Sequence, residues 1–130
     1  MELVSIITLL SIAEFIVMGV VVGAARGRYG IAAPATSGHE EFERRYRVHY
    51  NTLEQLIIFI PSIWIFGFYI GYVWAAAIGA VYLVGRVIYA RAYIQDPAAR
   101  GPGMILSVLP CWVLLVGGAT GAIWTLIQAG

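Results

Sequence analysis

The residues from Gln55 to Gly85 include no charged side chain, and this run of 31 positions constrains the fold more than any other feature. A helix crosses the hydrocarbon core of a bilayer in about 20 residues, so the run is too long for one crossing. We therefore expect the chain to turn at residues 67–72, where two glycines and two tyrosines are typical of a tight hairpin at a membrane interface.

Apolar stretches elsewhere in the chain indicate further crossings. The sequence is 61% apolar and only 12% charged, which excludes an ordinary soluble domain. We expect an all-α membrane protein in which residues 1–130 form one domain. The predicted subunit is a bundle of four transmembrane helices, at about residues 3–25, 46–69, 73–94 and 104–127.

All eight basic residues are arginines, and their distribution predicts an orientation. All of them except Arg86 lie around the first and third connections and in the adjoining helix ends, whereas the hairpin and the C-terminus have none. The positive-inside rule therefore places connections 1 and 3 in the cytoplasm. No basic run is long enough to follow a phosphate backbone, so we expect no nucleic-acid partner.

The densest polar cluster spans residues 41–55 and continues directly into an apolar segment. In a helix, Arg47, Asn51 and Glu54 fall at i, i+4 and i+7, so they project from one face. Such groups are costly in hydrocarbon unless they meet protein, a cavity or a polar ligand. This face is the candidate functional site.

The third predicted helix carries a second polar face, formed by Tyr82, Arg86, Tyr89 and Tyr93. At a rise of about 1.5 Å per residue, Arg86 lies about 10 Å inside the membrane and Glu54 about 9 Å. The two groups are expected to be level, so they can neutralise each other or share one polar ligand. Glu14 on the first helix interrupts its span, roughly 18 Å deep.

These groups would suit a small zwitterionic ligand with several carboxylates, because arginines, a carboxylate, an amide and phenols converge. A plainer interpretation is a structural Glu54–Arg86 ion pair with interfacial tyrosines. His49 points about 160° away from the Arg47 face on an ideal helix, which favours a role at the helix boundary. With only His39 and His49 available and no ligand spacing around them, we expect no metal site.

Three motifs together resemble one known family. They are the loop at 33–36, the run at 41–54, and the third-helix segment at 82–93. These residues resemble the MAPEG superfamily, the membrane-associated proteins in eicosanoid and glutathione metabolism. The resemblance implies a homotrimer in a bacterial inner membrane, in contact with membrane lipid. It also implies glutathione as co-substrate, bound between neighbouring subunits on the cytoplasmic side, and a lipophilic second substrate that arrives from the bilayer.

The resemblance also assigns roles by position. Arg100 resembles the arginine credited with stabilising the glutathione thiolate, and Arg28 is a second candidate for this catalytic role. Two departures from the leukotriene-synthase branch matter, because Gly27 replaces an arginine linked to catalysis and Gln55 replaces a tyrosine. The residues expected to bind glutathione are Arg26, Arg47, His49, Asn51, Glu54, Arg86, Tyr89 and Tyr93.

The function that the resemblance implies is a microsomal-type glutathione transferase acting on lipophilic electrophiles in detoxification. Glutathione-dependent peroxidase activity is a further option. Two alternatives stay open. One is a glutathione-binding protein without catalysis, an alternative that Gly27 and Gln55 leave open. The other is a structural or partner-binding membrane protein whose polar face only holds helices together.

Overall fold

The computed structural model describes residues 1–130 and has no strand. Its long helices are α1 (Glu2–Tyr29), α2 (Glu40–Tyr69), α3 (Tyr72–Gln95) and α4 (Gly101–Ala129), and a short 3₁₀ helix, η1 (Pro97–Arg100), precedes α4. All four long helices are long and apolar enough to cross a membrane. The predicted fold class, an all-α multi-pass membrane protein, is confirmed.

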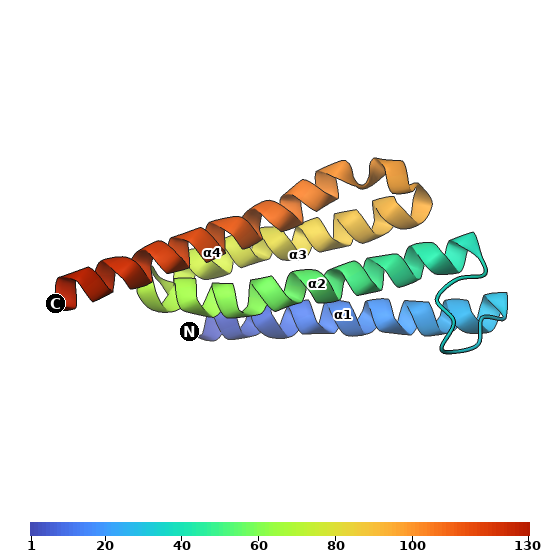
Figure 1. Ribbon diagram of the computed structural model, residues 1–130, viewed down its shortest axis with the longest axis horizontal. Helices are drawn as coiled ribbons and strands as arrows, with labels where there is room; N and C mark the ends of the chain where they lie inside the picture. The colour runs from blue at the N-terminus through green and yellow to red at the C-terminus, as the bar shows by residue number, and fades with distance from the viewer.

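The four helices lie side by side and alternate in direction (Figure 1). The α1–α2 connection and the α3–η1–α4 connection lie at one end (Figure 1). We call it the basic end because every arginine except Arg86 lies in η1 or in a helix segment next to one of these connections. The α2–α3 turn and both termini lie at the opposite end. Connections 1 and 3 therefore share one side of the bundle.

Most predicted boundaries agree with the structure to within a few residues. The turn between Tyr69 and Tyr72 falls inside the expected 67–72 hairpin, with Gly71 at φ +150°, a conformation that favours glycine. The first helix is longer than predicted: it ends at Tyr29, so Arg26 and Arg28 belong to its last turn. The fourth helix begins at Gly101, three residues earlier than expected.

The backbones of α3 and α4 approach each other closely at two glycines. A Cβ atom added to Gly85 would meet the backbone of Leu106, and one added to Gly103 would meet the backbone of Tyr89. Two glycines on facing helices thus allow backbone contact, as small residues do in membrane bundles. This contact fixes which side of α3 faces α4.

The apolar core fills the middle of the bundle, where Phe59 of α2 stacks on Tyr82 of α3 at 3.9 Å. The α1 helix contributes few buried side chains, namely Val4, Ser11, Val22 and Ala25. Most of its apolar surface is therefore exposed and available to lipid or to another subunit. The polar groups of interest lie between this core and the basic end.

Candidate functional site

The first turns of α2 are held by a local network of charges. His39 caps the helix, since its Nδ1 accepts a hydrogen bond of 3.1 Å from the amide of Glu41. Arg44 pairs with Glu40 and donates to the carbonyls of Ile94 and Gln95 at 3.2 and 3.0 Å, which ties α2 to the end of α3.

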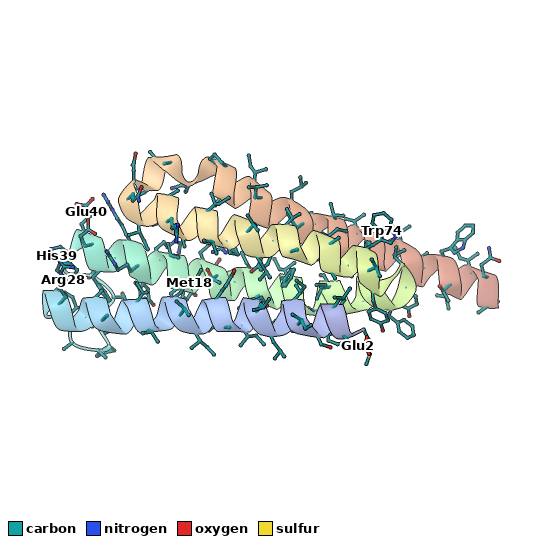
Figure 2. The ribbon with its side chains drawn as sticks, turned by 180° about the vertical axis from the view of Figure 1, so that it is seen from behind. Glu2, Met18, Arg28, His39, Glu40 and Trp74 are labelled. Atoms are coloured by element: carbon teal, nitrogen blue, oxygen red, sulfur yellow. The ribbon has the colours of Figure 1, made fainter.

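Arg45 pairs with Glu41 at 2.8 Å. These arginines therefore have local acidic partners, whereas Arg47 forms no ion pair or hydrogen bond within the chain. Figure 2 shows Arg28, His39 and Glu40 together at this end of the molecule. Arg47 is consequently an exposed guanidinium that is free to meet another group.

Arg47 and Tyr93 line a polar pocket of about 430 Å³ at the basic end. The pocket lies where α2 meets the α1–α2 connection and the end of α3. Its lining residues are Thr36, Glu40, Glu43, Arg44, Tyr46, Arg47, Tyr93 and Pro97. Two of the residues predicted to bind a ligand, from different helices, thus share one cavity.

The same face of α2 continues below the pocket through Asn51 to Glu54. Asn51 is half-buried, and Glu54 is exposed and has no ion-pair or hydrogen-bond partner within the chain. A carboxylate two turns inside a membrane helix is costly when it faces lipid tails. We infer that this face of α2 is covered by something polar when the protein is in a membrane.

Arg86 lies behind this face and is only 1% exposed. Its Nη2 donates to Thr52 Oγ1 at 2.5 Å, and its Nη1 donates to Asn51 Oδ1 at 3.2 Å and to Ser107 Oγ at 3.4 Å. The guanidinium also lies 4.3 Å from the ring centroid of Tyr89. Arg86 therefore joins α2, α3 and α4 through neutral groups.

The expected neutralisation of Arg86 by Glu54 does not occur in the structure. The two groups are at similar depth, but the Arg86 side chain turns into the bundle toward hydroxyls while the Glu54 carboxylate lies on the outer surface. Arg86 is thus enclosed by protein and not open to a ligand in this chain. Its contacts instead orient Asn51 and Tyr89 from behind.

Three of the predicted site residues lie at the basic end but outside the Arg47 pocket. Arg26 donates to the carbonyl of Ala35 at 2.7 Å and covers the ring of Phe42, so it holds the α1–α2 connection. Arg28 is exposed, 5.5 Å from the ring of its neighbour Tyr29. Arg100 is exposed at the last residue of η1.

His49 and Tyr89 also differ in their surroundings. His49 stacks on Phe15 of α1 at 4.4 Å, which agrees with its predicted direction away from Arg47. Tyr89 is 2% exposed, and its ring lies 5.6 Å from that of Tyr93, which is half-buried. Within one chain, the residues that remain open to a ligand on the Arg47 face are Arg47, Asn51, Glu54 and Tyr93.

Sequence reasoning missed the two hydroxyls that hold Arg86. Thr52 and Ser107 lie in apolar spans, where hydroxyl side chains often form bonds between helices. A threonine and a serine inside apolar spans could therefore have been recognised from sequence as candidate contacts between helices. Both hydroxyls also donate to a carbonyl one turn earlier in their own helix, Thr52 to Val48 and Ser107 to Gly103. A bond within the helix is what the sequence alone would lead one to expect. Their position opposite Arg86 depends on how α2, α3 and α4 are rotated about their axes relative to one another. The periodicity of a single helix does not specify that rotation.

The chain is similar to known proteins over most of its length. The profile described as the MAPEG family matches residues 4–120. An uncharacterised protein of Synechocystis sp. is 44% identical over 124 residues, which cover 95% of this chain and 90% of that protein. Human microsomal glutathione S-transferase 2 is 34% identical, covering 92% of this chain and 81% of its own length. Bovine leukotriene C4 synthase is 32% identical, covering 75% of this chain and 65% of its own length.

Proposed function

This chain belongs to the MAPEG family, and from that premise we propose that it is a membrane glutathione transferase acting on lipophilic electrophiles. Two of its relatives are a microsomal glutathione S-transferase and a leukotriene C4 synthase. The observation that carries the proposal is the open polar face of α2, where Arg47 and Glu54 have no partner in the chain while neighbouring arginines do.

The chemistry of this face matches the charged groups of glutathione. The tripeptide has two carboxylates and one ammonium, and a guanidinium binds a carboxylate through charge-assisted hydrogen bonds. In the proposed complex Arg47 binds a carboxylate, Glu54 binds the ammonium, and Asn51 and Tyr93 donate to peptide oxygens. Tyr89 and Arg86 support these groups from inside the bundle.

The proposed functional unit is a homotrimer with the site between neighbouring subunits. Arg26, Arg28, His49 and Arg100 do not reach the Arg47 pocket within one chain, and α1 leaves most of its apolar surface exposed. In a closed ring, every subunit presents the same pair of surfaces to its neighbours. Such a ring brings α1 residues of one subunit to the open α2 face of the next and covers Glu54.

The proposed mechanism is electrostatic activation of the thiol. A free thiol is mostly protonated at neutral pH, and the thiolate is the nucleophile. Arg100 is the first candidate to hold the thiolate, and Arg28 is the second because Gly27 supplies no charge. The sulfur attacks an electrophilic carbon, a carbon–sulfur bond forms, and the leaving group departs with the displaced electron pair.

The proposed location is a bacterial inner membrane, with the basic end in the cytoplasm, where glutathione would enter the polar pocket. The second substrate would arrive from the bilayer, past the apolar surface of the bundle. Thiol-reactive labelling of single cysteines introduced into the two connections and into the α2–α3 turn tests this orientation. Protection of the connections in intact cells, with labelling of the turn, is the expected pattern.

The direct test of the function adds glutathione to the detergent-purified protein and records ultraviolet absorbance by the thiolate, then conjugation of chlorodinitrobenzene. We expect both signals. Glutathione binding without either signal would favour the non-catalytic alternative, and no binding would favour the structural one. Reduction of a lipid hydroperoxide, measured in parallel, tests the peroxidase option.

A further inference from the structure

A second cavity, of about 520 Å³, lies between α1 and α3 with α2 as its floor. Its walls are regular helical stripes, which run from Leu10 to Val21 on α1 and from Leu83 to Ile94 on α3. The stripe on α1 is about 16 Å long at 1.5 Å per residue. This is about half of the roughly 30 Å hydrocarbon core, so the groove extends through one leaflet.

The groove is apolar along its length and basic at one end. Ten of its thirteen lining residues are hydrophobic, and the other three are Glu14, Arg45 and Arg91. Arg45 pairs with Glu41 through one nitrogen, and a guanidinium has further donors to offer. Arg91 is exposed and forms no ion pair or hydrogen bond within the chain. Both arginines lie near the basic end of the bundle.

Glu14 lies deeper in the groove, level with Arg86 on α3. The register follows from two contacts: Phe15, next to Glu14, stacks on His49, and Asn51, two residues further along α2, accepts from Arg86. A buried arginine held only by neutral groups at the same depth offsets the charge of Glu14. The net attraction at the mouth of the groove is therefore for an anion.

We infer that this groove binds one anionic phospholipid from the leaflet on the basic side. Its phosphate lies between Arg45 and Arg91, and an acyl chain lies along Val17, Val87 and Leu83. The groove is complementary to both parts of an anionic lipid. Its basic end suits a negatively charged head at the interface, and its apolar length suits a tail that spans one leaflet.

This lipid site is separate from the proposed glutathione site. Arg45 and Arg47 are two residues apart on α2, as are Arg91 and Tyr93 on α3. Two residues correspond to about 200° of helix rotation, so each pair points to opposite sides. Arg45 and Arg91 line the groove, whereas Arg47 and Tyr93 line the polar pocket. The inference therefore does not depend on the proposed catalytic activity.

The test uses delipidated protein in detergent, to which phosphatidylglycerol or phosphatidylcholine is added, with native mass spectrometry counting retained lipid per chain. We expect phosphatidylglycerol to be retained preferentially and to saturate at one molecule per chain. Arg91→Gln should reduce its retention about fivefold, since each arginine near an anionic head contributes on the order of 1 kcal/mol. Arg100→Gln removes the same charge at the same end, outside the groove, and should retain lipid normally.

A second variant tests the tail without changing charge. Val87→Trp fills the groove and should displace the lipid while the helical circular dichroism stays unchanged. Equal retention of the two lipids, or equal losses in Arg91→Gln and Arg100→Gln, would overturn the assignment. A change of oligomeric state in Val87→Trp would also overturn it, because the groove would then be covered by a second copy of the chain.

Discussion

Nη2 of Arg86 donates a 2.5 Å hydrogen bond to Oγ1 of Thr52, which places a buried guanidinium on a hydroxyl of the neighbouring helix. Thr52 immediately follows Asn51, whose side-chain oxygen also accepts from Arg86. The arginine thus holds the middle of the open α2 face from inside the bundle. The stability of the protein is therefore expected to depend on this contact.

Thr52→Val should destabilise the protein. The substitution keeps the shape of the side chain but leaves one donor of a buried arginine without its partner, at a cost of about 1–3 kcal/mol. Thermal unfolding in detergent measures the effect. Thr120→Val is the matched control, because Thr120 is exposed and its hydroxyl bonds only its own helix, at Val116. Equal unfolding temperatures for the two variants would contradict the assigned role of Arg86.

Gly103→Ala should be strongly destabilising, because the added methyl would meet the backbone of Tyr89 and push α4 away from α3. Overpacking of this kind costs about 1–3 kcal/mol, or more where backbone must move. Gly23→Ala in α1 is the control, since nothing lies within 4 Å of its added Cβ. The control should be neutral or slightly stabilising, as alanine favours a helix. A Gly103→Ala variant as stable as Gly23→Ala would contradict the close helix contact.

Arg100→Ala should lower the rate of conjugation while leaving glutathione affinity within several-fold. The reason is that the proposed role of Arg100 is to stabilise the thiolate, and one pKa unit of the bound thiol corresponds to about 1.4 kcal/mol. The measurements are the thiolate absorbance and the turnover rate of the same preparation. Unchanged turnover would remove Arg100 from the mechanism and leave Arg28→Ala as the next variant to assay.

Much of the fold follows from patterns within single stretches of sequence. The uncharged run at 55–85 requires a turn, and the turn lies at Ile70 and Gly71. The helical spacing of Arg47 and Glu54 places both on one face, and both are exposed in the structure. Such features depend only on the periodicity of one helix and on the thickness of a bilayer, so sequence reasoning reaches them.

The relation between helices is not encoded in the same local way. Equal depth suggested a Glu54–Arg86 pair, yet the rotation of α3 turns Arg86 toward Thr52 and Ser107. That rotation is fixed by the backbone contact of Gly85 with Leu106 on α4. Depth along a helix can be counted from sequence, whereas the neighbour that a side chain meets depends on packing around the helix axis.

The central claim, that the open α2 face binds glutathione, is tested most directly by thermal unfolding of the purified protein across a glutathione titration. A ligand that binds only the folded state raises stability by RT ln(1 + [L]/Kd), about 2.7 kcal/mol at a hundredfold excess over Kd. The experiment compares wild type with Glu54→Gln, which removes the charge from the face, and with Glu2→Gln, which removes an exposed charge at the opposite end.

We predict a saturable rise in unfolding temperature for wild type and for Glu2→Gln, and no rise for Glu54→Gln. A similar rise in all three proteins would place glutathione elsewhere and contradict the assigned face. No rise in any of them would mean that the polar face of α2 does not bind glutathione and serves to hold subunits or helices together.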